Sequence, residues 1–314
     1  MLFVTANRGD GDPQPLPSPL GDTLMLHVYS CDDQRGGFKR LFAEIQDDLL
    51  HAKSIGIGEW QSQKTPLRMR ELINVAFNMR MPSVPEVAAR ETGAHLPWAE
   101  DHFLERIGGQ PLNPAPSEAW WPFAKKTDSG TNKDHKSEGE AFSHTYPERM
   151  WPKFAEVEHE EVTDGVNTYV HPTEINQGIR FEYADLNDVV TLLKRSPATR
   201  QAYLPLWFPE DGTASLESKR VPCTLGYHFI IRDHQLHITY FMRSTDLLRH
   251  FQDDIYLAIR LAQWVCEQIN DSLEVPALSV GELNFHTVNM HIFDDDVPMI
   301  DFRKKQGQVW MELS

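Results

Sequence analysis

The sequence predicts a mixed α/β (α+β) protein in which helices pack on a large sheet within a single domain, residues 1–314. Alternating apolar residues in Gly226–Arg232 and Leu236–Met242, joined by Asp233-His234-Gln235, predict a β-hairpin. Apolar residues recur at helical spacing over Asp254–Ile269, which predicts a largely buried helix. Hydrophobic residues make up 40% of the 314 residues, enough for a substantial core.

The first half of the chain alternates irregular and regular segments. Residues 1–22 are rich in Pro, Gly and Asp around positions 9–21 and predict an irregular segment. The expected elements that follow are a strand at Leu24–Tyr29, a helix at Gly37–Ala52, a strand at Leu72–Met79 and a helix at Pro97–Ile107. The last of these begins at a proline and ends before Gly108-Gly109.

Residues 112–140 begin with prolines and tryptophans and then become strongly polar, so we predict a surface insertion there. Beyond it, Leu186–Arg195 predicts a helix and Ala202–Phe208 a strand. At least one more strand is expected within Ala277–Phe293.

Composition excludes some function classes. The net charge of −16 opposes binding to nucleic acid through a broad basic surface. The sequence has no apolar run near the roughly 20 residues of a membrane span, and its N-terminus has no signal-peptide pattern. Three sparse cysteines indicate a reducing compartment. We therefore expect a soluble, cytoplasmic protein.

Cys223, which follows Pro222 and precedes the predicted hairpin, is a candidate nucleophile if nearby arginines lower the pKa of its thiol. The alternative is an inert buried cysteine, which we expect for Cys266 on the apolar face of its helix. Arg200 and Arg243 lie near predicted strand ends, where a cation can project into a site or simply face solvent. Asp246, Asp253 and Asp254 fit no recognised metal-binding loop, so no metal site is predicted.

These candidates fall into motifs that resemble a known family. Residues 222–224 (PCT), 242–246 (MRSTD) and 253–255 (DDI) resemble the thymidylate synthase superfamily. Residues 145–151 (TYPERMW), 194–207 (KRSPATRQAYLPLW) and 285–293 (FHTVNMHIF) match further family segments in the same order. The resemblance covers roughly residues 95–295 and is greatest to the phage deoxycytidylate hydroxymethylases. It implies the large mixed sheet of that fold.

The resemblance implies a catalytic group. Cys223 would add as a thiolate to C6 of a pyrimidine and so make C5 nucleophilic. Tyr146 would assist removal of the C5 proton, and Glu100 would organise water and protons near the base. From the sequence alone, Glu100 could equally be a solvated carboxylate on a helix face.

The resemblance also implies the binding residues. Arg243 and Ser244 would hold the 5′-phosphate of a pyrimidine deoxynucleoside monophosphate, and Arg200 would come from a second subunit of a homodimer with shared sites. His291 and Asn289 would bind the sugar. Asp246 and Trp121 would bind 5,10-methylenetetrahydrofolate, the one-carbon donor.

Two departures affect these binding roles. Gln201 stands where the family has a second arginine, and Phe293 stands where it has a tyrosine.

Asp254 is the position that discriminates between bases. Synthases place Asn there, which suits uracil, whereas a carboxylate accepts from the 4-amino group of cytosine. Thr224 and Met242 stand where synthases have His and Gln, as in the hydroxymethylase branch. The sequence therefore predicts hydroxymethylation of dCMP, in the host cytoplasm if the source is a phage. The alternatives are a dUMP hydroxymethylase, a synthase-type methylase of dUMP or dCMP, and a non-catalytic nucleotide-binding protein.

Overall fold

The computed structural model describes residues 26–31, 36–60, 63–123, 141–155, 159–163, 168–172, 178–217, 219–271 and 277–305. The predicted irregular segment, residues 1–22, lies outside these ranges, as do residues 124–140 of the predicted insertion.

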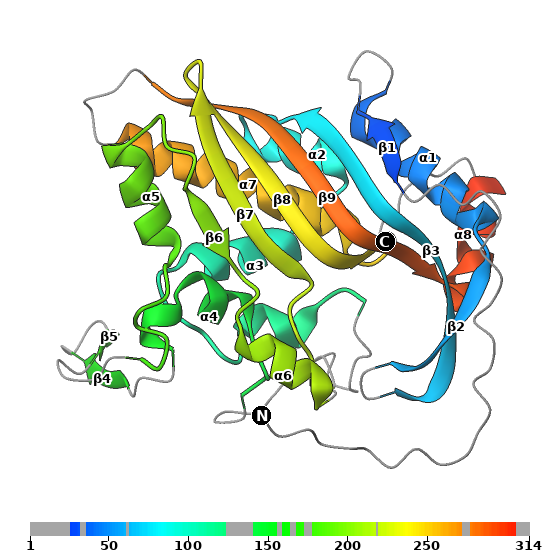
Figure 1. The fold of residues 1–314 in the computed structure, drawn as a ribbon, viewed down its shortest axis with the longest axis horizontal. Helices are drawn as coiled ribbons and strands as arrows, with labels where there is room; N and C mark the ends of the chain where they lie inside the picture. The colour runs from blue at the N-terminus through cyan, green and yellow to red at the C-terminus, as the bar shows by residue number, and fades with distance from the viewer. Residues whose placement is uncertain are drawn as a thin grey trace, which may run out of the picture.

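A seven-stranded mixed sheet forms the centre of the molecule (Figure 1). Together with two strands that lie outside this sheet, the described strands are β1 (His27–Ser30), β2 (Ser54–Trp60), β3 (Gln63–Arg80), β4 (His159–Thr163), β5 (Thr168–Pro172), β6 (Tyr203–Pro205), β7 (Thr224–Arg232), β8 (Gln235–Asp246) and β9 (Ser279–Phe293). The main order is β1-β3-β9-β8-β7-β6, with β2 paired to β3. Strands β4 and β5 form a separate two-stranded sheet.

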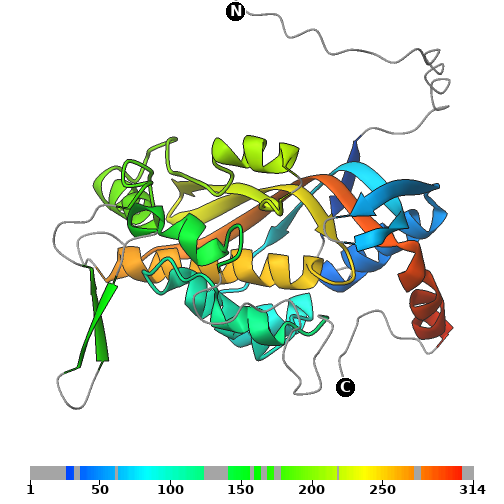
Figure 2. The same ribbon diagram turned by 90° about the horizontal axis from the view of Figure 1, so that it is seen from below.

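The helices are α1 (Gly37–His51), α2 (Pro85–Thr92), α3 (Trp98–Ile107), α4 (Tyr146–Met150), α5 (Leu186–Arg195), α6 (Glu210–Leu216), α7 (Phe251–Asn270) and α8 (Val297–Lys305). Short 3-10 helices cover Pro116–Trp120, Pro152–Phe154 and Asp294–Asp296. Figure 2 shows α7 directly beneath the sheet, with α2 and α3 forming a further layer below it. Helix α6 lies on the opposite side of the sheet.

The predicted hairpin is present, with a tighter turn than expected. Strands β7 and β8 pair antiparallel, and Gln235 already belongs to β8. Asp233 and His234 both have positive φ, 50° and 59°, as a two-residue hairpin turn of type I′ requires. Strands β8 and β9 pair in parallel, and α7 provides the crossover that a parallel connection needs.

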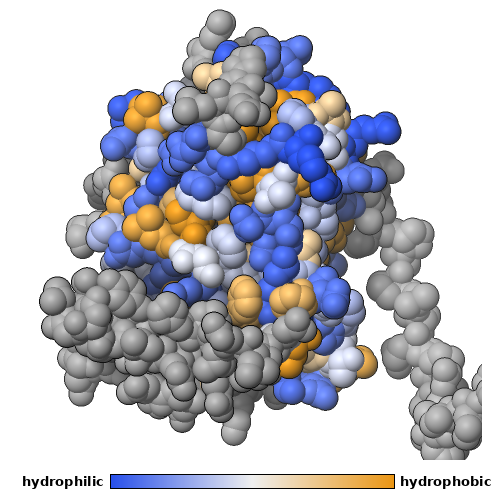
Figure 3. Space-filling view, turned by 90° about the vertical axis from the view of Figure 1, so that its left-hand side faces the viewer, coloured by the Kyte–Doolittle hydropathy of each residue, from blue (hydrophilic) through white to orange (hydrophobic). Residues whose placement is uncertain are grey.

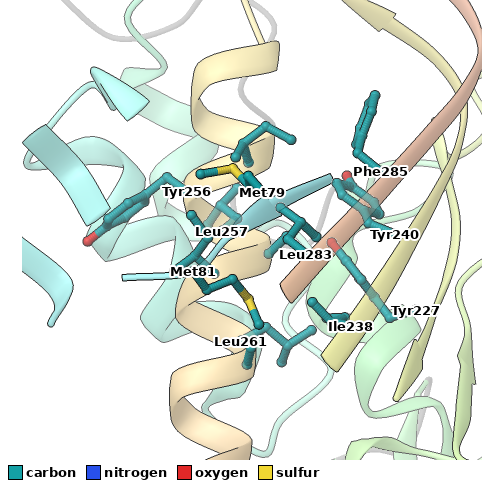
Figure 4. Packing of buried hydrophobic residues seen from close by; sticks show 14 of the residues in the cluster. Met79, Met81, Tyr227, Ile238, Tyr240, Tyr256, Leu257, Leu261, Leu283 and Phe285 are labelled. Carbon is teal, nitrogen blue, oxygen red and sulfur yellow. The ribbon is translucent and has the colours of Figure 1, made fainter. Parts of the chain in front are cut away.

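Helix α7 is buried on nearly all sides because it lies between two layers. All seven apolar positions that predicted it (residues 255, 258, 259, 262, 265, 266 and 269) are buried. Figure 4 shows Leu257 and Leu261 close to the sheet residues Ile238 and Leu283. Tyr256 points the other way and donates a hydrogen bond to Glu100 of α3. The prediction that Cys266 is a core residue is confirmed.

Helix α5 matches the prediction residue for residue, whereas two strands differ in length. Strand β3 is 18 residues long and extends well before the apolar run at Leu72–Met79. Strand β6 covers three residues of the segment predicted as a strand, because it pairs with β7 only over Tyr203–Pro205.

The described beginning of the predicted insertion, residues 112–123, is packed against the core, so a surface insertion starting at 112 is wrong there. Trp98 of α3 donates a hydrogen bond to the Ser117 carbonyl, and Ser117 is fully buried. Trp120 and Trp121 pack against the main hydrophobic core.

Among the described residues, no helix is long and apolar enough to cross a membrane. On the face drawn in Figure 3, apolar side chains are interspersed with polar ones. The largest apolar side chains lie instead between the sheet and its helices.

Candidate active site

Cys223 lies immediately before β7, where the β7–β8 pairing fixes its position. Thr224 pairs with Met242, and the Arg243 backbone N–H donates to the Cys223 carbonyl at 2.7 Å. This register brings the Arg243 guanidinium to the nucleophile, with Nη2 3.7 Å from Cys223 Sγ. The predicted association of Cys223 with a cation is therefore seen in the structure.

The effect of the arginines on the thiol differs from the expectation. Burial raises the pKa of Cys223, and the nearby charge of Asp254 raises it further. Arg243 and Arg220 lower the pKa, but they do not outweigh burial. The condition set for Cys223 as a nucleophile, that nearby arginines lower the pKa of its thiol, is not met in the free protein, because burial outweighs the arginines.

Tyr146 opens α4 and lies beside Cys223. A capping box of Thr145 and Glu148 holds this end of the helix, since each side chain accepts from the other residue's backbone N–H. Thr224 Oγ1 donates to Tyr146 Oη at 3.3 Å and lies 2.9 Å from Tyr240 Oη. Burial raises the pKa of Tyr146, and the charge of Cys223 adds to the effect.

Asp254 sits in the first turn of α7. Thr245 Oγ1 donates to Asp254 Oδ2 at 3.0 Å. Burial raises the pKa of Asp254 to about 7, while Arg106 is the strongest influence in the opposite direction. The charge of Asp254 in turn raises the pKa of Cys223 and of Tyr146. The predicted nucleophile, proton-transfer residue and base-reading carboxylate thus form one electrostatically coupled group.

A second cluster lies where β8, β9 and β3 run side by side. Ser244 pairs with Asn289 in the parallel β8–β9 register. Ser244 Oγ is 3.4 Å from Asn289 Oδ1 and 3.3 Å from His291 Nδ1, and Asn289 Nδ2 donates to Glu71. Burial lowers the pKa of His291 to about 4, so its imidazole is neutral at pH 7. The structure therefore brings together three of the residues expected to bind phosphate and sugar, and adds Glu71.

Asp246 and Trp121, the expected folate-binding residues, belong to the described part of the chain. Asp246 Oδ1 accepts from the backbone of Leu248 and Arg249, whereas the buried Oδ2 has no hydrogen-bond partner among the described residues. Burial raises the pKa of Asp246 to about 6. Trp121 stacks on His250, with ring centroids 4.7 Å apart.

Glu100 and Arg200 are not joined to Cys223 by the contacts of the described residues. Glu100 accepts from Tyr256 at 2.6 Å and forms an ion pair with Arg260 at 2.8 Å. These bonds outweigh burial and lower the pKa of Glu100. Arg200 is exposed before β6, and its carbonyl oxygen is 3.0 Å from His228 Nε2. The predicted roles of both residues stay predictions.

Two cations of the site were not singled out in the sequence. Arg220 stands three residues before Cys223, and Arg106 stands in the last turn of α3. Proximity to the Pro-Cys motif could have indicated Arg220. Nothing in the sequence marks Arg106, whose role depends on how α3 packs against α4 and α7. No group of three His, Cys, Asp or Glu side chains that could hold a metal ion is found in the described ranges.

Comparison with known proteins places this geometry in a family. The sequence matches the thymidylate synthase family model over residues 139–308. A putative thymidylate synthase of Methanosarcina mazei is 28% identical over 120 residues, which are 38% of this chain and 51% of that protein. One from Methanothermobacter thermautotrophicus is 30% identical over 115 residues, 36% of this chain and 47% of that protein. The chain spans about half the length of these relatives.

The fold has a counterpart among solved structures. Thermostable thymidylate synthase A from Bacillus subtilis matches with a TM-score of 0.53 at 14% identity, over 85% of this chain and 84% of that one. This match concerns the fold alone. With the family match over more than half of the sequence, the chain belongs to the thymidylate synthase family. The family uses 5,10-methylenetetrahydrofolate as its cofactor and co-substrate.

Proposed function

We propose that the protein transfers a one-carbon unit from 5,10-methylenetetrahydrofolate to C5 of a pyrimidine deoxynucleoside monophosphate. The specific reaction we propose is hydroxymethylation of dCMP to 5-hydroxymethyl-dCMP. The observation that carries this proposal is that Asp254 belongs, with Cys223 and Tyr146, to one half-buried, electrostatically coupled group. A carboxylate at that place suits the 4-amino group of cytosine.

The residues of the chain divide the chemistry among them. Cys223 Sγ, after losing its proton, bonds to C6 and moves an electron pair to C5. C5 would bond to the one-carbon unit and then lose its own proton toward Tyr146 Oη, directly or through water, while the carbon–nitrogen bond to the folate breaks and tetrahydrofolate leaves. Water adds to the exocyclic methylene that results. The C6–S bond then breaks, so that Cys223 leaves as a thiolate and the transfer involves no net oxidation.

Thr224 supports water as the final nucleophile. Its hydroxyl lies between Tyr146 Oη and Tyr240 Oη, at 3.3 and 2.9 Å. A group of three hydroxyls can orient a water molecule as both donor and acceptor. Methyl transfer would instead need a hydride at the same carbon. We therefore favour hydroxymethyl transfer, with methyl transfer as the alternative that the names of the archaeal relatives suggest.

The residues fit a folate. Asp246 Oδ2 is a buried acceptor without a hydrogen-bond partner among the described residues, and it suits an N–H donor of a pterin ring. Trp121 gives a flat aromatic surface and stacks on His250, which follows Asp246 closely in the chain. When bound, methylenetetrahydrofolate would supply the carbon electrophile. Asp246 would orient it, and Trp121 would pack against it.

The remaining roles follow the same proposal. Arg243, an exposed guanidinium beside Cys223, would bind the 5′-phosphate with Ser244. Asn289 and His291 would hold the sugar. Arg200 is exposed and would reach the phosphate bound by a second copy in a homodimer. A phage source, and use of the product in DNA modification, stay predictions from the resemblance.

The test is to incubate the protein with methylenetetrahydrofolate and either dCMP or dUMP and to weigh the products. A product about 30 Da heavier is hydroxymethylated and one about 14 Da heavier is methylated, as the one-carbon chemistry on a Cys223 adduct requires. Cys223→Ser should abolish turnover, whereas Cys266→Ser, in the core, should retain it. Turnover that survives Cys223→Ser would refute the mechanism. Nucleotide binding without any turnover would indicate a non-catalytic binding protein.

A further inference from the structure

Arg106 is a buried cation with no carboxylate partner among the residues that the structure describes. Arg106 is only 4% exposed, and its Nε has no hydrogen-bond partner among the described residues. Its Nη2 lies 2.9 Å from His102 Nε2, and no ion pair joins Arg106 to a carboxylate in the described part of the chain. Buried guanidinium groups are normally paired, since an unpaired buried charge is costly. Its retention calls for a function.

The position of the guanidinium points to that function. Its Cζ lies 4.1 Å from the centroid of the Tyr146 ring, in a cation–π arrangement. The Trp151 indole holds the helix end in place by donating to the Arg106 carbonyl at 2.8 Å. The charge of Arg106 therefore lies directly against the ring of the proposed proton-transfer residue, and His102 fixes its other side.

Charged and titratable groups from several helices and strands surround Asp254. The titratable and charged groups that interact with it are Arg106 of α3, Asp253 of α7, Asp246 and Tyr240 of β8, Tyr227 of β7, Tyr146 of α4 and Cys223. Among the charged groups that act on Asp254 most strongly, Arg106 is the cation, and Asp253 and Asp246 are acids.

We propose that Arg106 is a positioning residue that favours the carboxylate form of Asp254 and holds the Tyr146 ring in place, and so directs the site toward a base with a 4-amino group. This proposal rests on the proposed function. A carboxylate accepts a hydrogen bond from the 4-amino group of cytosine, whereas a protonated carboxyl can donate to the 4-oxygen of uracil. Removing the charge of Arg106 would therefore shift the site from the first base toward the second.

Arg106→Met tests the charge while keeping most of the side-chain length, and Arg106→Lys retains the charge. The measurements are the dissociation constants of dCMP and dUMP and the kcat/KM for each, between about pH 5 and pH 9. We expect Arg106→Met to lower the dCMP-to-dUMP preference about tenfold near neutral pH, since one nearby charge shifts a buried carboxyl by about one pKa unit. The pH at which dCMP binding is half-lost should rise by a similar step, and Arg106→Lys should stay near wild type.

Arg149→Met is the matched control. Arg149 is an equally buried arginine that lies over an aromatic ring, 4.6 Å from the centroid of Phe208, but it is paired with Asp211. Its loss should destabilise the fold and leave the base preference unchanged. If Arg106→Met behaves in the same way, with an unchanged preference and pH profile, the proposal is wrong. Arg106→Gln provides a second neutral variant should the methionine variant fail to fold.

A readout without turnover separates this proposal from the proposed function. In protein labelled with carboxyl-¹³C aspartate, the Asp254 resonance is identified by its absence from Asp254→Asn, and its pKa is read by NMR titration. A neutral residue at 106 should raise that pKa. If wild type converts neither nucleotide, the proposed function fails, and an Asp254 pKa unaffected by residue 106 overturns the present proposal independently.

Discussion

Replacing Asp254 by Asn is expected to stabilise the protein at neutral and alkaline pH. The pKa of Asp254 is about 7 in the folded protein, because of burial, against a usual value of 3.8. Between these two values the folded state binds one more proton than the unfolded state, so the free energy of unfolding falls as the pH rises. Each pKa unit corresponds to about 1.4 kcal/mol, which gives a loss of about 4 kcal/mol over the whole interval. The contribution of Asp254 is complete below about pH 4 and lost above about pH 7.

Urea unfolding of wild type and Asp254→Asn at several pH values between about 4 and 8 measures this directly. The advantage of the Asn variant should grow with pH to about 4 kcal/mol and then level off. A difference between wild type and Asp254→Asn that does not change with pH would refute the argument, because it would mean that Asp254 has the same pKa in both states.

Four further changes test the scaffold of the protein. Arg149→Met should lower the free energy of unfolding by about 3–5 kcal/mol in urea, because Asp211 would be left as an unpaired buried charge. Gly226→Ala should destabilise by about 1–3 kcal/mol, since its Cβ would lie 2.6 Å from the Leu204 carbonyl oxygen across the β6–β7 pair. Gly212→Ala in α6, whose Cβ meets nothing within 4 Å, should instead be neutral or raise the melting temperature slightly. Thr145→Ala should cost about 1 kcal/mol through the lost cap of α4, a loss visible in thermal unfolding.

The elements that could be predicted are those in which apolar residues recur at regular spacing along the whole element. Helix α7 repeats its buried positions over five turns, and the β7–β8 hairpin alternates on both sides of a two-residue turn. Strand β3 was predicted only over its apolar C-terminal half, because Arg68 and Arg70 belong to an earlier part that carries charge. Those two arginines form ion pairs with Asp294, a long-range contact that a local pattern does not contain. Residues 112–123 were misread because their prolines suggest a loop, whereas Trp98 and Trp121 anchor the segment through contacts distant in the sequence.

The sequence predicted which residues form the site, but only partly which of them are ionised. The order of the motifs already indicated that Cys223, Tyr146, Arg243 and Asp254 belong together. Whether each is ionised depends on burial, and burial depends on the packing of α3, α4 and α7 around the ends of β7 and β8. For that reason the sequence suggested an activated thiolate, whereas the structure has a thiol with a raised pKa.

The charges of the site suggest why it needs cations on two sides. Cys223 and Asp254 are both half-buried, and an anionic Asp254 raises the cost of ionising Cys223. Arg243 and Arg220 act on the thiol side, but Arg243 is also the proposed phosphate ligand, so a bound nucleotide would occupy its charge. Arg106 is not among the proposed phosphate ligands, and it acts on Asp254. The positive charge of Arg106 is therefore the part of the balance that substrate binding leaves intact, and base reading can persist while the thiol is being activated.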